Sequence, residues 1–226
     1  TYADGNWLYF EKSTYKYDSQ GNIIEEVGQM YNNAWINTVK VAVEYDNNGN
    51  GTSLLRYTWD GNQWVNEIKE LSSYDTNNRQ TLFELYTWAG DKWIGEVKEE
   101  TAFDDNGNQT LKIDFEWDAE SDTFIYTHKL EQEFTDGLIM SQADSYWNKE
   151  RQDWSGEVYM MDGELGHEVL IHNGKVIFTY NELGKETSQV YSLLIENVWE
   201  RQLALETSYT TLESGEIETI RKAYRY

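Results

Sequence analysis

A repeat of about 29 residues is the feature of this sequence that most constrains its fold. An aromatic residue recurs with a second aromatic ten positions later, as Trp7 with Tyr17, Trp35 with Tyr45, Trp64 with Tyr74, Trp93 with Phe103, Phe124 with Phe134 and Trp199 with Tyr209. Five of these pairs have a lysine five residues after the first aromatic: Lys12, Lys40, Lys69, Lys98 and Lys129, spaced by 28, 29, 29 and 31 residues. Self-similarity at a fixed period indicates a repeat architecture, in which each unit stacks on its neighbours.

Short polar strings begin at the second aromatic of four of these pairs, and a fifth string begins at Tyr180. They are YDSQGN, YDNNGN, YDTNNR, FDDNGN and YNELGK, beginning at residues 17, 45, 74, 103 and 180. The Asp or Asn at the second position can accept hydrogen bonds from nearby backbone amides, and the Gly or Asn supplies the left-handed residue that a hairpin loop requires. The strings therefore predict hairpin turns. Loops 60–63 and 89–92, each preceded by Tyr-x-Trp, predict the turns at the opposite ends of the strands.

The repeat predicts an all-β fold. Each unit contains two strands of about ten residues, and the chain has no proline to interrupt a ladder. We therefore expect an antiparallel meander of roughly fourteen to sixteen strands made of tandem double-hairpin repeats. Simple alternation places Trp35 and Val41 on one face and Lys40 on the other, yet Glu11, Glu70 and Glu99 lie mid-strand on the aromatic side. Burying lone carboxylates is costly, so we expect a curled sheet, a hollow shell or a wide barrel instead of a packed sandwich.

The chain is interpreted as one repeat-array domain over residues 1–226. Regular repeats cover residues 1–147, and degenerate or capping repeats cover residues 148–226, where Trp154 lacks an aromatic ten residues on. The string HNGK at 172–175 predicts a two-residue hairpin turn between 168–171 and 176–180. The string MMDGELG at 160–166 predicts a change of register. Because the chain begins with Thr, we interpret its start as processed or trimmed.

Charge and composition exclude several classes of function. There are 41 acidic against 18 basic residues, for a formal charge of −23. Such a charge repels nucleic-acid phosphates and anionic lipid headgroups, and no apolar run is long enough for a membrane-spanning helix, so we expect neither nucleic-acid binding nor membrane insertion. A basic protein is the more compatible macromolecular partner. The absence of cysteine excludes thiol catalysis, disulfides and thiolate metal sites.

Two acidic loops resemble cation sites. Asp46, Asn48 and Asn50 followed by Gly51 match the opening of a calcium loop, but Tyr57 stands where that loop requires a bidentate Glu. A second loop contains Asp118, Glu120 and Asp122. Hairpin chemistry explains both loops better than a weak calcium site does, so we expect no metal and no cofactor.

Catalytic motifs are weak. The histidines are His128, His167 and His172, and in HEVLIH the second histidine follows the first by five positions, which on a strand sends the two rings to opposite faces. The many carboxylates single out no glycosidase pair, and neither G-x-S-x-G nor a phosphate-binding glycine loop occurs. The best-defined residues recur in every unit, whereas catalysis needs one distinctive place. We therefore expect a non-enzyme with no catalytic residues.

The turn strings resemble those of tyrosine–aspartate (YD, or RHS-type) repeat proteins. The matching positions are Tyr17, Asp18, Gly21 and Asn22; Tyr45, Asp46, Gly49 and Asn50; and Phe103, Asp104, Gly107 and Asn108, while the third copy departs with Asn78 and Arg79. The pattern is most similar to exported cell-surface repeat proteins of Bacteroidota, and it covers residues 1 to about 147. This resemblance implies shells, stalks and surface scaffolds without a common active site, and a secreted or cell-surface location.

These observations lead to two hypotheses for function. The first is a structural, adhesive or self-assembling scaffold, in which edge strands, above all 216–226, pair with another chain. The alternative is a carbohydrate-binding module that stacks sugars on rows of Trp and Tyr. Because every repeat carries these rings, we favour a structural role for them, as cross-strand clamps. The lysine column is interpreted as a set of ion-pair partners for Glu67 and Glu96 on a hydrated face.

Overall fold

The computed structural model describes residues 10–154, 173–195, 198–212 and 217–226, and assigns strands in a few short segments outside these ranges. All regular elements in the described part of the chain are strands, so it contains no helix long and apolar enough to cross a membrane. In chain order the strands are β1 (Tyr2–Ala3), β2 (Asn6–Trp7), β3 (Glu11–Tyr17), β4 (Ile23–Tyr31), β5 (Trp35–Tyr45), β6 (Gly51–Trp59), β7 (Trp64–Tyr74), β8 (Gln80–Trp88), β9 (Trp93–Phe103), β10 (Gln109–Asp118), β11 (Thr123–Thr135), β12 (Leu138–Tyr146), β13 (Glu157–Met161), β14 (Glu168–His172), β15 (Gly174–Tyr180), β16 (Glu186–Ile195), β17 (Val198–Thr211) and β18 (Ile217–Arg225).

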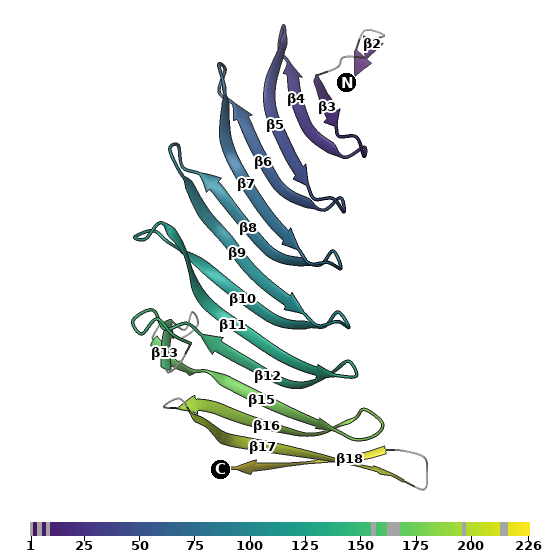
Figure 1. Ribbon diagram of the computed structural model, residues 1–226, viewed down its shortest axis with the longest axis vertical. Helices are drawn as coiled ribbons and strands as arrows, with labels where there is room; N and C mark the ends of the chain where they lie inside the picture. The colour runs from purple at the N-terminus through teal and green to yellow at the C-terminus, as the bar shows by residue number, and fades with distance from the viewer. Residues whose placement is uncertain are drawn as a thin grey trace. The chain divides into compact units, whose positions relative to one another are not determined.

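Fourteen strands form one antiparallel meander (Figure 1). The order runs from β3 to β12 and then from β15 to β18, so that the strands follow one another as they do in the sequence except where β13 and β14 intervene. The order ends at β3 and β18, which do not pair with each other, so the sheet is open and not closed into a barrel. The predicted all-β meander is confirmed. Of the three predicted forms, a curled sheet, a hollow shell and a wide barrel, the chain forms a sheet that is not closed.

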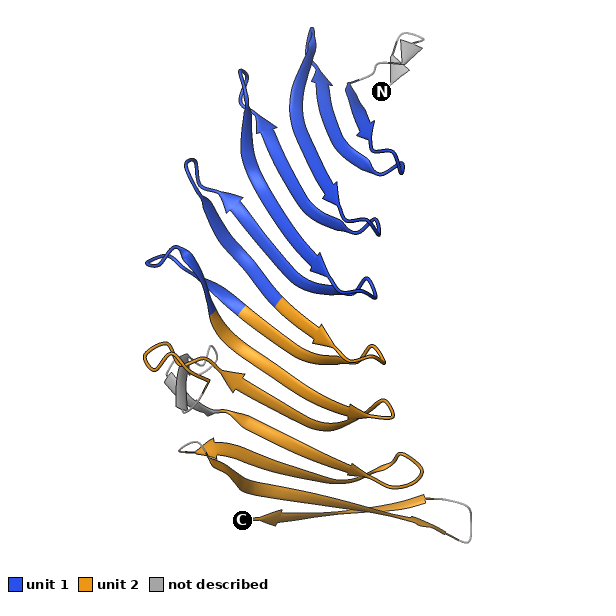
Figure 2. Ribbon diagram, viewed as in Figure 1, with its two compact units in different colours: residues 1–99, 115–125 blue, residues 100–114, 126–226 orange. Residues whose placement is uncertain are grey.

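The chain divides into two compact units (Figure 2). The first contains residues 1–99 and 115–125, and the second contains residues 100–114 and 126–226. The first unit therefore holds the regular repeats from β3 to β8, and the second holds the strands from β12 to β18.

The predicted hairpin turns are present at the glycine positions. Gly21, Gly49 and Gly107 have φ values of 91°, 87° and 90°, and Asn78 takes the same place in the third copy with a φ of 61°. Residues with a side chain rarely adopt this left-handed region, and asparagine is among the exceptions. The departure of the third string from the pattern, Asn for Gly, therefore preserves the turn.

A β-bulge near the start of the long strands changes which residues share a face. In β7, Asn66 is opposite Tyr57 and Ile68 is opposite Arg56, so Glu67 is an extra residue. In β5, Asn37 is opposite Gln29 and Val39 is opposite Gly28, so Thr38 is the extra residue. An extra residue shifts the two-residue alternation by one. The predicted alternation is therefore wrong: Lys40 lies on the face of Trp35, which we call the lysine face, and Val41 lies on the opposite, valine face.

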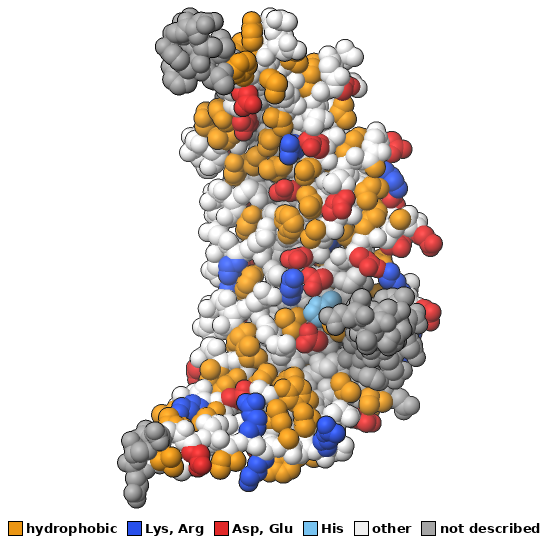
Figure 3. Space-filling view, turned by 180° about the vertical axis from the view of Figure 1, so that it is seen from behind, with side chains coloured by type: hydrophobic (Ala, Val, Ile, Leu, Met, Phe, Trp, Pro, Cys, Tyr) orange, Lys and Arg blue, Asp and Glu red, His pale blue; other side chains and the backbone are white. Residues whose placement is uncertain are grey.

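The sheet lacks a packed core. Among the described residues, the only buried hydrophobic side chain is that of Ala204, which is 6% exposed. The strand residues of β5 to β10 are mostly half-buried, whichever face they lie on. Figure 3 shows hydrophobic side chains interspersed with acidic and basic ones on one face. Stabilisation must therefore come mainly from contacts between neighbouring strands of a single layer.

The predicted hairpin at HNGK is wrong. β14 pairs with β13, whereas β15 pairs with β12 and β16, so the strands on either side of Asn173 belong to different sheets. Asn173 is fully buried; its Oδ1 accepts a hydrogen bond from the Tyr146 amide at 2.8 Å, and its Nδ2 donates to the Trp154 carbonyl. Its own carbonyl accepts from the Leu194 amide at 2.9 Å. These tertiary hydrogen bonds override the local turn preference of Asn-Gly. Of the predicted register change at 160–166, residues 162–166 lie outside the described residues.

Candidate functional site

The most regular constellation of side chains is a ladder of lysines over aromatic rings. Lys40 Nζ lies 4.1 Å from the ring centroid of Tyr57 and 5.5 Å from that of Trp64. One repeat later, Lys69 Nζ lies 4.0 Å from Tyr86 and 5.2 Å from Trp93. The other members are Lys12 over Trp35, Lys98 over Phe115 and Lys129 over Trp154, while Lys185 in the last turn makes a separate contact with Tyr209. We call this set the lysine–aromatic ladder. Most of these side chains are half-buried, and a cation–π contact contributes about 0.5–1 kcal/mol when exposed and about 2 kcal/mol when desolvated.

The lysine column forms ion pairs in part, as predicted: Lys98 pairs with Glu84 at 3.3 Å and Lys129 with Glu131 at 2.8 Å, but the predicted partners Glu67 and Glu96 have other contacts. Glu67 Oε2 instead pairs with Arg56 Nε at 3.0 Å, and Glu96 Oε1 accepts a hydrogen bond from Thr87 Oγ1 at 2.6 Å. The bulge explains the difference, because it moves the lysines onto the face of the rings and leaves the glutamates at or near the extra position.

Aromatic pairs close the hairpin ends, as predicted for a structural role. Trp59 and Trp64 meet edge to face with centroids 5.1 Å apart, and Trp88 and Trp93 repeat the contact at 5.0 Å. In the next copy Trp117 and Phe124 pack over Gly95, where an added Cβ would collide with both rings. Each of these rings thus has one side against a partner ring, and Trp64 and Trp93 also have a lysine nearby, which reduces the area free for a ligand.

The acidic loops carry out turn chemistry. Asp46 Oδ1 accepts hydrogen bonds from the amides of Asn48 and Asn50, both at 2.9 Å, and its Oδ2 accepts from Asn50 Nδ2 at 2.9 Å. The Asn50 side chain, followed by these amides, holds the pKa of Asp46 below its usual value. In the second loop, Asp122 pairs with Lys92 at 2.6 Å. Within the described ranges, no three acidic or histidine side chains are grouped so that they could hold a metal ion.

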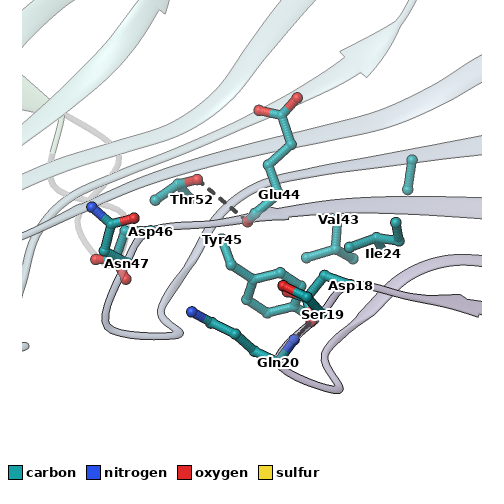
Figure 4. A pocket seen from close by; sticks show the side chains of 11 residues that line it. Asp18, Ser19, Gln20, Ile24, Val43, Glu44, Tyr45, Asp46, Asn47 and Thr52 are labelled. Atoms are coloured by element: carbon teal, nitrogen blue, oxygen red, sulfur yellow. Dashed lines mark hydrogen bonds between the residues drawn. The ribbon is translucent and has the colours of Figure 1, made fainter.

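An open hollow of about 700 Å³ lies between the turns of the first two repeats (Figure 4). Its lining residues are Asp18, Ser19, Gln20, Ile24, Ala42, Val43, Glu44, Tyr45, Asp46, Asn47 and Thr52. The Tyr45 hydroxyl donates to the Ile23 carbonyl at 3.0 Å, and Thr52 Oγ1 donates to the Glu44 carbonyl at 3.3 Å. Asp18 and Asp46 serve their own turns, and the Glu44 side chain points away from Tyr45 and Gln20 (Figure 4), so these carboxylates do not converge in the hollow.

A row of three ionisable side chains crosses β10, β11 and β12. His128 Nδ1 lies 3.3 Å from Asp114 Oδ2, and His128 Nε2 lies 3.1 Å from Asp144 Oδ1. The imidazole also packs against Tyr146, with centroids 5.0 Å apart and the two rings tilted by 42°. Sequence reasoning missed this row because it depends on the register of three strands. Because both ring nitrogens are engaged by different carboxylates, the row joins strands and does not converge on one point. The predicted HEVLIH interpretation concerns His167 and the side chain of His172, which lie outside the described residues.

Comparison with known proteins gives distant structural neighbours. No family model matches the chain, and no curated protein matches its sequence. A DUF3836 family protein from Parabacteroides distasonis is 17% identical over 45% of this chain and 90% of its own, with a TM-score of 0.29. A DUF3836 family protein from Bacteroides vulgatus is 14% identical over 59% and 98%, with a TM-score of 0.22. A protein of unknown function from Bacteroides fragilis is 10% identical over 73% and 88%, with a TM-score of 0.23. These neighbours all come from Bacteroidota, and none is described as a YD or RHS repeat protein.

Proposed function

We propose that this chain is a non-enzymatic repeat scaffold, secreted or displayed at the cell surface, that self-associates through its edge strands. One observation carries the proposal: the side chains that recur in every repeat are used by the fold itself. The lysines cover rings and the aspartates hold turns, as Lys40 and Asp46 illustrate. Among the described strands, β3 and β18 each pair with a single neighbour, which leaves one side of each without a strand partner there.

The edge strands support an assembling role. Every residue of β3 and of β18 is exposed. Large apolar side chains are among them, including Tyr17 at 57% and Ile217 at 53% exposure. An exposed edge with apolar side chains is a template to which another strand can add by backbone hydrogen bonds. The proposed location rests on the resemblance of the turn strings to exported repeat proteins.

A carbohydrate-binding module is the second candidate, and one exposed aromatic pair favours it. Tyr31 and Trp35, at the β4–β5 turn, meet with centroids 5.4 Å apart, and Trp35 is 38% exposed. Such rings can stack on sugar rings. Lys12 Nζ, however, lies 4.6 Å from the Trp35 centroid and competes for that face, which places this candidate second.

Two measurements test these proposals. Sedimentation velocity over a range of concentrations in near-physiological salt is expected to show association that increases with concentration. A single monomeric species at the highest concentration would contradict the scaffold proposal. Tryptophan fluorescence titrated with a glycan panel is expected to show no shift; a shift that disappears in Trp35→Ala would favour the carbohydrate-binding module instead.

A further inference from the structure

We propose that copies of this chain join end to end, with β18 of one copy antiparallel to β3 of the next and Arg225 opposite Glu11. This pairing rests on the self-association proposed above, and it specifies which edges meet and in what register. The partner is therefore a second copy, and its recognition element is an edge strand.

Strand direction permits this pairing. The meander has fourteen antiparallel strands, an even number, so β3 and β18 run in opposite directions. The β3 strand of a second copy can therefore continue the antiparallel alternation of the sheet order beyond β18 of the first. Antiparallel addition continues the hydrogen-bonding pattern of the sheet without a change of type.

The outward backbone groups are in phase. The Tyr226 amide donates to the Gln202 carbonyl at 3.3 Å, so the even-numbered residues of β18 hydrogen-bond to β17. In antiparallel pairs, residues alternate between this arrangement and one in which N–H and C=O point away. Arg221, Ala223 and Arg225 therefore present their backbone groups outward.

The same reasoning applies to β3. The Tyr31 amide donates to the Phe10 carbonyl at 2.8 Å, which places the even-numbered residues of β3 toward β4. Glu11, Ser13 and Tyr15 therefore present outward groups. Odd-numbered residues of one edge can thus pair with odd-numbered residues of the other.

The faces match in the same phase. Tyr15 is opposite Glu26, which is opposite Val41, so Tyr15 lies on the valine face together with Tyr45. The Tyr45 hydroxyl donates to the carbonyl of Ile23, the first residue of the preceding strand. The repeat makes the equivalent contact near the C-terminus.

At that end, the Tyr209 hydroxyl donates to the carbonyl of Glu186, the first residue of β16, at 2.9 Å. Tyr209 is directly opposite Thr219, so the odd-numbered residues of β18 lie on the face that corresponds to the valine face. Pairing odd-numbered residues of β18 with odd-numbered residues of β3 therefore lets their outward N–H and C=O groups form hydrogen bonds. It also keeps the valine face of both copies on the same side of the sheet.

Charge selects the register. With Arg225 opposite Glu11, the following pairs are Tyr224 with Lys12, Ala223 with Ser13, Lys222 with Thr14, and Arg221 with Tyr15. This brings a cation to a carboxylate and two cations to tyrosine rings. Moving the register by two residues in either direction places Lys222 opposite Lys12 or Lys16, and like charges directly opposite each other are destabilising. In the described part of the chain, neither Glu11 nor Arg225 has an ion pair of its own.

A twofold pairing of β18 with β18 is the competing outcome. It would also be in phase, with Glu218 opposite Lys222, but it would leave β3 of both copies unpaired. End-to-end pairing uses both edges and continues beyond two copies.

Disulfide trapping tests the register directly, because the chain contains no cysteine. Ser13→Cys and Ala223→Cys are prepared as separate variants, since both residues are exposed. Opposite residues of a hydrogen-bonded antiparallel pair have Cα atoms about 5.5 Å apart, which a disulfide can span. Oxidation of the equimolar mixture is expected to give a reducible covalent dimer that neither variant gives alone. In the control mixture Thr219→Cys replaces Ala223→Cys and displaces the thiol by four residues, roughly 13 Å, so the dimer is expected to be lost.

Each outcome separates the two proposals. Association in sedimentation without the mixed dimer would overturn the end-to-end register while leaving a self-associating scaffold. A dimer formed equally in both mixtures, or by Ala223→Cys alone, would also overturn it. A monomer in sedimentation, with no dimer in any sample, would overturn both.

Discussion

The regular repeats from β5 to β8 and the C-terminal strands from β15 to β18 share their turns but differ in what lies on the strands. Asn181 holds the last turn as Asp46 holds an early one, with Oδ1 accepting from the amides of Leu183 and Lys185 at 3.0 Å. The lysine column, however, has no equivalent in β17, where Ala204 stands five residues after Trp199, and Lys185, which covers Tyr209, lies in the last turn. The only buried hydrophobic side chain described, Ala204, lies in the C-terminal strands. The Asp or Asn turn is therefore common to both regions of the meander, whereas the layer of aromatic rings across neighbouring strands belongs to the regular repeats.

The sharpest test of that layer is Gly95→Leu, for which we expect the largest effect. The side chain would enter the space held by the rings of Trp117 and Phe124, which meet with centroids 5.2 Å apart. Forcing side chains out of a packed arrangement costs about 1–3 kcal/mol, and thermal or urea unfolding should report a loss at the upper end of that range. Gly174→Ala is the matched control, since nothing lies near its added Cβ. Equal stability of the two variants would show that the aromatic layer does not constrain the regular repeats.

The C-terminal strands have a different weak point, at Asn173. Asn173→Ala leaves the Tyr146 amide and the Trp154 carbonyl without this partner. An unsatisfied buried polar group costs about 1–3 kcal/mol. We expect a loss of stability in that range, together with faster hydrogen exchange at Tyr146. Asn47→Ala, in an exposed turn position, is the control and should behave as the unmodified chain does. Unchanged exchange at Tyr146 would remove Asn173 as the tertiary anchor of this region.

The turns were predictable from the sequence, whereas the faces were not. Asp18 and Gly21 act within their own loop, so local preferences determine the outcome. The bulge at Glu67 has no local signature, because it is defined by the pairing of Asn66 and Ile68 with another strand. The same limit hid the contacts of His128 and made HNGK resemble a hairpin. Sequence periodicity thus predicted the meander and its turns but not the ladder, which depends on one extra residue per long strand.

Acidification should distinguish the turns held by an aspartate from the last turn, which is held by Asn181. Hydrogen bonds lower the pKa of four turn aspartates below 3.8. The largest contribution comes from the side chain of Asn22 for Asp18, of Asn50 for Asp46 and of Asn108 for Asp104, and from the Arg79 amide for Asp75. A lowered folded-state pKa contributes stability above the unfolded pKa and loses it as the pH falls through the folded value. We expect the melting temperature to fall on acidification below about pH 4, and expect replacement of all four aspartates by asparagine to flatten that decline. Asn181→Asp is the converse variant, and it should steepen the decline. An unchanged acid response in the fourfold variant would contradict this role.

The smallest expected effect measures the ladder itself. Lys40→Met keeps an apolar stem of similar length over Tyr57 and Trp64 but removes the cation, whereas Lys185→Met removes it from Tyr209 alone. A cation–π contact contributes about 0.5–1 kcal/mol when exposed and about 2 kcal/mol when desolvated, and these side chains are half-buried, so urea unfolding should show the larger loss at position 40. Lys92→Met is the control for the loss of a cation, because Lys92 pairs with Asp122 on the surface. If Lys40→Met and Lys185→Met lose the same stability, the second ring adds nothing. The difference between the two regions would then lie in ring–ring packing at the hairpin ends instead of in the lysines.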